Sequence, residues 1–349
     1  MENERPPQRA AGLSGIPALL AELGVDPSRA FEGLSFAPGE LTPDAMLPFG
    51  EAMQLLANCE RLTGLEHFGV MLGTRHDHLS LGFIGEVMDV APTLGEAIRD
   101  YVRVQIGLSR GAAVYSYPIG DDVTFGFGIY ARHHPGVKQA YGFTMAVASN
   151  IVRALTGGRS NPGEVLLCHR FPANPGAFQR FLKAKPLFDQ HQSCVIFPRR
   201  DLQVANPRAD RARYKALSAQ LDARIRPGGA TSSALVLHKM KPILMQGEYS
   251  LEAVASRLDL HPRTLNRRLL DDGTSFAAIR DEVRFRLAQE LLALTDLPIG
   301  DVAAALSFSS HGNFVRAFRR WAQATPTVWR ARAEESGLRP GDFGNQKRV

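Results

Sequence analysis

The sequence contains little cysteine and no long apolar run. Its three cysteines are odd in number and far apart, which excludes a disulfide framework or a zinc site and is typical of a reducing cytoplasm. No stretch of about 18 apolar residues occurs, so no membrane-spanning helix is predicted. The first ten residues, MENERPPQRA, carry charges of both signs and no apolar segment, which argues against a signal peptide. We therefore expect a cytoplasmic protein without a membrane partner.

Motifs for catalysis and cofactor binding are also missing. The chain has no Walker motif, G-x-G-x-x-G, H-E-x-x-H or paired-cysteine site. Gly107–Gly111 does match the G-x-S-x-G nucleophile elbow, with Ser109 at its centre. That elbow needs a strand before the serine and a helix after it, whereas here a helical pattern comes first. We interpret these glycines as a helix cap and turn, and predict no enzyme activity, catalytic residue or cofactor.

The composition is otherwise that of a globular protein, but its charge is unevenly spread. The 349 residues are 44% hydrophobic and 22% charged, and this length favours two domains. The net charge of +6 is mild, yet Val302–Ala333 contains five arginines and no acidic residue. A solvated helix face usually mixes both signs, whereas a segment of one sign is typical of a surface that binds a polyanion. We therefore expect a nucleic acid partner.

Residues 17–225 predict a domain of mixed helices and strands. Helical spacing of apolar residues predicts helices at 41–62, 93–108, 136–156 and 175–182. Alternation predicts strands at 113–117, 123–130, 163–171 and 193–197, the first two forming a hairpin. This order is neither a regular βαβ alternation nor a run of strands, so we predict an α+β fold. The polar residues 1–16 before it are expected to be disordered.

The chain changes character after residue 225. A helical stretch at 209–225 is followed by the turn residues RPGGAT, and we place a linker at 226–231. From 232 to 332 almost every segment has helical spacing, which predicts an all-α domain. The tail at 333–349 is expected to be disordered.

The all-α domain contains an internal repeat. Leu251–Leu258 (LEAVASRL) matches Ile299–Leu306 (IGDVAAAL), and Leu265–Leu269 (LNRRL) matches Phe314–Phe318 (FVRAF). The apolar residues of each first segment form one stripe, on which the apolar pair of the second segment packs. The polar residues of that second segment then point outward. Such a pair of helices predicts a helix-turn-helix, whose second helix enters the DNA major groove; a plain repeat of helical hairpins is the alternative.

The all-α domain resembles the DNA-binding domain of the AraC family of bacterial transcription regulators. The resemblance covers Tyr249–Arg332 and rests on SLEAVASRL, RTLNRRLLDDGTSFAAIRDEVR, LLALTDLPIGDVAAALSFSS, NFVRAFRRW and TPTVWR. It implies two helix-turn-helix units joined by a central helix. These units would read two major-groove segments on one face of the DNA, about 10 base pairs apart.

The same resemblance implies which side chains contact DNA. Base edges would be read by three residues of each recognition helix: Arg263, Asn266 and Arg267 in the first, and His311, Asn313 and Arg316 in the second. Phosphates would be contacted by Arg268, Arg319 and Arg320.

The chain departs from the family pattern at both turns and at one helix cap. Asp259 and Ser307 stand where glycine is usual, although aspartate tolerates the left-handed conformation. His261 replaces the usual serine before the first recognition helix, which should weaken its cap. Gly312 offers no side chain to DNA. We therefore expect the second unit to contribute less sequence specificity than the first.

Residues 17–225 more loosely resemble the N-terminal effector domain of the ornithine-utilisation-regulator-like branch of this family, often labelled arabinose-binding. The signs are PTLGEAI, the hairpin after it, and VIFPRRDL. This resemblance implies a small-molecule sensor that also forms a homodimer, and the label does not identify the ligand. Candidate effector-binding residues are Tyr101, Arg103, Tyr130 and His133. For Arg103 we favour the alternative of a surface ion pair.

No metal site is predicted in this domain. His76 and His78, and the pair His133-His134, are histidine clusters, but no cysteine accompanies them. Residues two apart on a helix also do not face each other. We interpret these histidines as solvated or hydrogen-bonded.

The sequence as a whole predicts a regulator that binds double-stranded operator DNA under the control of a small molecule, and that contacts RNA polymerase if it activates. One alternative is an enzyme whose nucleophile is Ser109. Another is an architectural DNA-binding protein that has no effector.

Overall fold

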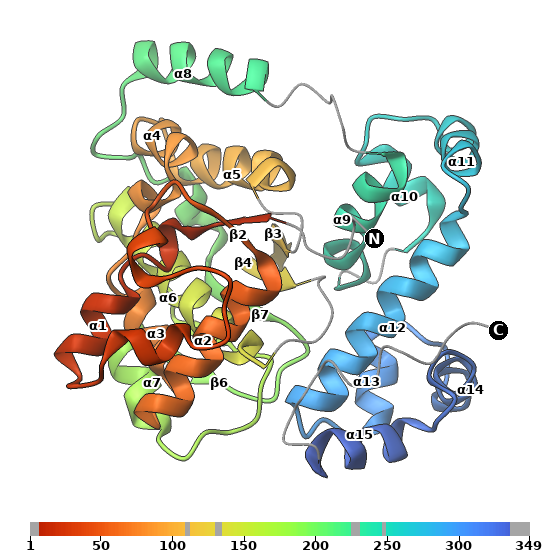
Figure 1. Cartoon of the computed structure of the whole chain (residues 1–349). Helices are drawn as coiled ribbons and strands as arrows, with labels where there is room; N and C mark the ends of the chain where they lie inside the picture. The colour runs from red at the N-terminus through yellow and green to blue at the C-terminus, as the bar shows by residue number, and fades with distance from the viewer. Residues whose placement is uncertain (1–6, 109–111, 130–134, 225–230, 246–248, 336–349) are drawn as a thin grey trace. The chain divides into compact units, whose positions relative to one another are not determined.

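The computed structural model of the protein describes residues 7–108, 112–129, 135–224, 231–245 and 249–335. The chain divides into two compact units, Met1–Arg226 and Pro227–Val349 (Figure 1). In the described part of the chain, no helix is both long enough and apolar enough to cross a bilayer.

The first unit is built on a five-stranded sheet with the strand order β3-β4-β7-β5-β6. Its strands are β3 (Ala112–Ile119), β4 (Asp122–Ile129), β5 (Glu164–Leu166), β6 (Lys185–Leu187) and β7 (Ser193–Pro198). Only β5 and β6 pair in parallel, and the other neighbours are antiparallel. The predicted hairpin is confirmed as β3 and β4. Its turn contains Gly120, whose φ of 58° is a conformation that glycine adopts at little cost.

Helices accompany this sheet and complete the predicted α+β fold. They are α1 (Ile16–Glu22), α2 (Phe49–Thr63), α3 (Phe68–Gly73), α4 (Phe83–Asp89), α5 (Leu94–Leu108), α6 (Val137–Leu155), α7 (Pro175–Leu182) and α8 (Arg211–Arg224). Thr93 caps α5 by accepting a hydrogen bond from the backbone N–H of Glu96 at 3.2 Å, as its position predicts. Ile98 of α5 and Ile151 of α6 meet Phe125 of the sheet in one buried core.

Residues 7–16 differ from the expectation of disorder. They form β1 (Pro7–Arg9), which pairs with β2 (Met46–Pro48), and the short 3-10 helix η2 (Ala10–Gly12). Ala10 and Ile16 are fully buried. The apolar residues in this proline-rich segment therefore anchor it to the first unit, because their burial offsets the entropy lost on ordering it.

The second unit is helical throughout its described residues. Its helices are α9 (Ser232–Met245), α10 (Leu251–Ser256), α11 (Pro262–Asp271), α12 (Phe276–Leu294), α13 (Ile299–Ala305), α14 (His311–Ala322) and α15 (Pro326–Glu335). Within this unit, α12 runs from the α10–α11 pair to the α13–α14 pair (Figure 1). Helix α15 continues three residues past the predicted domain end at 332, because Ala333 is buried.

Candidate nucleic-acid interface and small-molecule cavity

The first helix-turn-helix consists of α10 and α11. Val254 and Ala255 of α10 and Leu265 and Leu269 of α11 are all fully buried, as the apolar spacing predicts. The turn between the helices places Asp259 at a φ of 53°. The left-handed conformation expected at the usual glycine position is thus present with an aspartate. The backbone N–H of Leu260 closes the turn by donating to the carbonyl of Ala255 at 2.9 Å.

His261 caps the first recognition helix, α11, despite replacing the usual serine. Its ring nitrogen Nδ1 accepts a hydrogen bond from the backbone N–H of Arg263 at 3.2 Å. The cap therefore requires the tautomer whose proton is on Nε2. Pro262 follows at the first helical position, where its missing N–H costs nothing.

The second helix-turn-helix, α13 and α14, repeats this backbone geometry. Ser307 has a φ of 56°, and the backbone N–H of Phe308 donates to the carbonyl of Ala303 at 3.0 Å. Ser310 caps α14 by accepting from the backbone N–H of Asn313 at 3.2 Å. The internal repeat seen in the sequence is therefore a repeat of structure.

Arg284 of α12 anchors the second turn and was not singled out from the sequence. Its side chain is 7% exposed, and its guanidinium carbon lies 4.8 Å from the ring centre of Tyr249 and 4.5 Å from that of Phe308. Its Nη2 donates to the carbonyl of Ser307 at 2.8 Å. Burial lowers the pKa of this guanidinium, and the two rings and the carbonyl compensate for the lost water.

The predicted DNA-contacting residues lie on α11 and α14 outside the buried apolar pairs of these helices. Those on α11 are all exposed: Arg263, Asn266, Arg267 and Arg268. On α14, Asn313 is half-buried and the others are exposed: His311, Arg316, Arg319 and Arg320. This exposure leaves most of each predicted set available to a partner.

The two faces differ in how their side chains are held. On α14, the side-chain amide of Asn313 donates to the Ser309 hydroxyl at 2.8 Å and accepts from Arg316 Nη2 at 2.5 Å. Arg320 forms an ion pair with Asp281 of α12 at 2.8 Å. On α11, the side chains of Arg263, Asn266 and Arg267 have no hydrogen bond or ion pair to any other residue that the structure describes.

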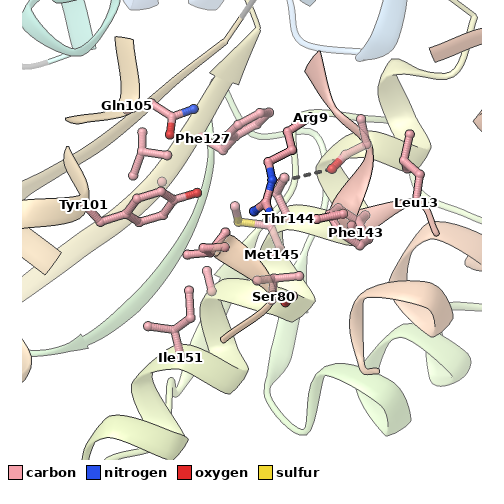
Figure 2. Close-up of a pocket in the computed structure, with 18 of the residues that line it drawn as sticks. Arg9, Leu13, Ser80, Tyr101, Gln105, Phe127, Phe143, Thr144, Met145 and Ile151 are labelled. Atoms are coloured by element: carbon pink, nitrogen blue, oxygen red, sulfur yellow. Dashed lines mark hydrogen bonds between the residues drawn. The ribbon is translucent and has the colours of Figure 1, made fainter. Parts of the chain in front are cut away.

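The first unit contains a cavity of about 140 Å³ between α5, α6, the β3–β4 hairpin and the N-terminal segment. Its wall is largely apolar and includes Phe49, Met53, Leu56, Leu81, Val114, Phe125, Phe127, Phe143, Met145 and Ile151. The polar residues in the wall are Arg9, Ser80, Tyr101, Gln105 and Thr144. Figure 2 shows the hydroxyl of Tyr101 and the guanidinium of Arg9 pointing toward each other across this space.

The candidate effector-binding residues separate in the structure. Tyr101 lines the cavity, and burial raises the pKa of its hydroxyl, which keeps it protonated. Arg103 does not line it, because it forms ion pairs with Asp100 at 3.4 Å and with Asp222 of α8 at 2.6 Å. The structure thus places Arg103 in the surface ion pair that was favoured for it, outside the cavity wall. Tyr130 and His133 lie outside the described residues.

Two polar cavity residues escaped the sequence analysis. Gln105 lies one helical turn after Tyr101 on α5, so the i, i+4 spacing could have indicated it. Arg9 belongs to the segment that was expected to be disordered. Nothing local could have placed it opposite α5.

Helix α5 connects the cavity to α8. Tyr101 and Gln105 face the cavity, whereas Asp100 and Arg103 face α8. The carboxylate of Asp100 accepts a hydrogen bond from the hydroxyl of Tyr214 on α8 at 2.7 Å. Burial and this carboxylate raise the pKa of Tyr214 to about 12. A displacement of α5 would therefore change the contacts of α8, the last described helix of the first unit.

Two further sequence features can be placed in the structure, namely the G-x-S-x-G segment and the histidines near residue 76. Helix α5 precedes and strand β3 follows the G-x-S-x-G segment, the reverse of the order that a nucleophile elbow needs, although Ser109 itself lies outside the described residues. His78 is buried and its Nε2 lies 2.9 Å from Asp89 Oδ1. In the part of the chain that the structure describes, no group of three or more histidine, cysteine or acidic side chains is placed to hold a metal ion.

Both units match known protein families. Residues 24–206 match the arabinose-binding N-terminal domain of AraC transcription regulators, and residues 254–332 match a helix-turn-helix domain. The chain is 27% identical over 336 residues to the HTH-type transcriptional regulator VirS of Mycobacterium tuberculosis, covering 94% of this chain and 98% of that protein. It is 27% identical over 328 residues to the ornithine utilization regulator of Pseudomonas aeruginosa, covering 89% and 93%. These relatives are transcription regulators, not enzymes.

A solved structure also aligns with most of the chain. It is the transcriptional regulator CdpR from Pseudomonas aeruginosa, at 20% sequence identity and a TM-score of 0.48. The alignment covers 92% of this chain and 98% of that one.

Proposed function

The chain belongs to the AraC family of transcription regulators, and from this we propose that it reads operator DNA through two unequal recognition helices under the control of a small molecule. The observation that carries the proposal is the structural repeat: α11 and α14 follow the same turn and each present a polar, arginine-containing face. A central helix of 19 residues spans about 28 Å at 1.5 Å per residue. That span is close to one turn of DNA, which suits two successive major-groove segments about 10 base pairs apart.

On this proposal, the side chains divide into base readers and phosphate contacts. Arg263, Asn266 and Arg267 of α11, and His311, Asn313 and Arg316 of α14, contact base edges, where each bidentate pair discriminates by about 1–3 kcal/mol. Arg268, Arg319 and Arg320 contact phosphates and contribute affinity that falls with salt. Arg320 exchanges Asp281 for phosphate on binding.

The cavity of the first unit holds the effector, and α5 transmits its presence. A ligand that contacts Tyr101 and Gln105 shifts α5, and with it the contacts from Asp100 and Arg103 to α8. Helix α8 directly precedes the segment that leads to the second unit. For a ligand to control DNA binding, the protein must have two arrangements of α5 and α8, and the ligand must bind one of them more tightly than the other. We further propose that the protein acts in the cytoplasm as a homodimer, and contacts RNA polymerase if it activates transcription.

The proposal is tested by capture of sheared genomic DNA with the purified full-length protein at near-physiological salt, followed by sequencing. The matched control carries Arg267→Ala and Arg316→Ala. Enrichment of sites with two short blocks about 10 base pairs apart, lost in the variant, supports the proposal. Equal recovery of these sites by both proteins contradicts it. If only a background that falls with salt is recovered, repeating the capture with residues 232–349 distinguishes a need for the ligand from a helical unit that reads no sequence, and only the second contradicts the proposal.

A further inference from the structure

The cavity of the first unit has the size of a single ring. Its volume is about 140 Å³. A protein cavity of about 150 Å³ lined by aliphatic and aromatic side chains binds benzene. The part of a ligand that this space encloses therefore has one six-membered ring with small substituents.

The walls favour an aromatic ring. Phenylalanine rings enter the wall from α2, β4 and α6, and the ring of Tyr101 enters from α5: Phe49, Phe125, Phe127, Phe143 and Tyr101. Aromatic rings attract one another in offset or edge-to-face pairs beyond the effect of buried area. A planar ring gains such contacts on several sides here.

Few polar groups of the wall are available to a ligand. The hydroxyls of Ser80 and Thr144 already donate to backbone carbonyls, Ser80 to Asp77 at 2.6 Å and Thr144 to Ala140 at 2.9 Å. Arg9 Nη2 lies 2.7 Å from the carboxylate of Asp44. The sugar named in the family description has several hydroxyls, and most of them would remain without a partner in this cavity.

Gln105 is the exception. Its side chain is 4% exposed, and its carbonyl oxygen Oε1 is buried without a hydrogen-bond partner among the described residues. This oxygen can only accept a hydrogen bond, so a ligand group that reaches it must be a donor. The Tyr101 hydroxyl lies one helical turn away and stays protonated, so it can donate to the same ligand atom (Figure 2).

We propose that the cavity binds a small aromatic molecule that carries a hydroxyl group, which donates to Gln105 Oε1 and accepts from the Tyr101 hydroxyl. The inference rests on the proposed function, in which this cavity is the effector site. It gives that site a ligand class that differs from a sugar.

The first test needs no ligand and compares two buried glutamines of the same unit. Gln139 is 1% exposed but fully paired, because its Oε1 accepts from the N–H of Gly69 at 2.7 Å and its Nε2 donates to the carbonyl of Glu66 at 2.9 Å. Gln139→Leu therefore lowers Tm, whereas Gln105→Leu raises it by removing an unpaired oxygen. A lower Tm for both variants would make Gln105 a structural residue and overturn the inference.

The second test measures the affinity of the full-length protein for phenol, toluene, benzoate and L-arabinose by calorimetry. We expect phenol to bind and L-arabinose not to bind. Gln105→Leu should weaken phenol binding by about tenfold and leave toluene binding unchanged, which isolates the hydrogen bond. Equal changes for phenol and toluene would overturn the role of Gln105.

The remaining outcomes separate this inference from the proposed function. Binding of L-arabinose without phenol would overturn the ligand class and leave the regulator intact. Binding of benzoate without phenol would do the same, because it would assign recognition to Arg9. Phenol binding that depends on Gln105 supports the inference even if capture of genomic DNA fails, in which case the fault lies in the proposed DNA function.

Discussion

The first and second helix-turn-helix units build the same turn from different side chains. Asp259 and Ser307 have φ values of 53° and 56°, and equivalent backbone hydrogen bonds close the two turns at 2.9 and 3.0 Å. Around that common backbone, the first helix-turn-helix packs aliphatic residues and the second helix-turn-helix packs a cluster of aromatic rings. On α11, the side chains of Arg263, Asn266 and Arg267 have no partner among the described residues, whereas on α14 Asn313, Arg316 and Arg320 are paired. The common backbone therefore does not decide how each helix-turn-helix is stabilised or how its outward side chains are held.

The packing difference gives the largest expected effect. Leu265 and Phe314 occupy equivalent buried positions, and the ring of Phe314 lies 5.4 Å from that of Phe308 and 5.7 Å from that of Phe318. We expect Phe314→Ala to lower the free energy of unfolding by about 4 kcal/mol and Leu265→Ala by about 3 kcal/mol. Urea unfolding followed by tryptophan fluorescence measures this selectively, because both tryptophans, Trp321 and Trp329, lie in the second unit. A larger loss for Leu265→Ala would contradict the comparison.

The pairing difference predicts unequal effects on DNA affinity. Arg267→Ala should weaken operator binding by about 2 kcal/mol, roughly 30-fold, because its side chain contacts the base without losing a partner. Arg316→Ala should cost less than about 1 kcal/mol, because Arg316 must leave Asn313 to reach DNA. Gel-shift titration on a captured site measures both losses, with the exposed Arg29→Ala of the first unit as a control for charge. Equal losses for the two arginines would remove the asymmetry.

Lowering the pH should reduce the free energy of unfolding of the second unit through the part that packs on α9. His238 of α9 is 6% exposed, and burial lowers its pKa from 6.5 to about 4. The folded state holds this histidine neutral, so its contribution is complete above pH 6.5 and is lost as the pH falls toward 4. Unfolding at pH 5.5 should therefore require about 1.2 kcal/mol less than at pH 7. The variant His238→Gln should lose most of this dependence, and an unchanged pH profile would exclude His238 as its cause.

The turns themselves give the smallest expected effect. Asp259→Gly should raise the free energy of unfolding by about 1 kcal/mol, because an exposed aspartate gains little in the left-handed conformation. Ser307→Gly should raise it by about half as much, because the Ser307 hydroxyl also donates to the carbonyl of Leu244 at 3.5 Å. Urea midpoints measure both. A loss of stability for Asp259→Gly would show that its side chain supports the turn.

The sequence predicted the second unit well because its signals are local. Apolar residues at helical spacing placed Val254, Ala255 and Leu265 in the core, and the repeat revealed the turns at Asp259 and Ser307. His261 was expected to weaken its cap, and the structure shows that an imidazole nitrogen accepts the hydrogen bond that a serine would. The anchoring of the second turn by Arg284 depends on Tyr249, 35 residues before it, and no local pattern reports such a contact.

The cavity of the first unit was largely beyond prediction because it is assembled from distant segments. Arg9, Gln105 and Ile151 share one wall although they are far apart in the chain. The surface ion pair favoured for Arg103 is present, but its partner, Asp222, lies 119 residues later and could not be named from the sequence. Only Gln105 had a usable signal, since it follows Tyr101 by one turn of α5. Apolar periodicity identifies a buried face but does not show which buried polar atom lacks a partner.

The central claim is the proposal that two unequal helix-turn-helices read adjacent segments of DNA. It is tested most directly by selecting binding sites from a random-sequence DNA library. The account predicts two blocks about 10 base pairs apart, one strongly and one weakly constrained. Repeating the selection with Arg267→Ala should erase the strong block alone. A single block, or two blocks of equal strength that Arg267→Ala leaves in place, would contradict the account.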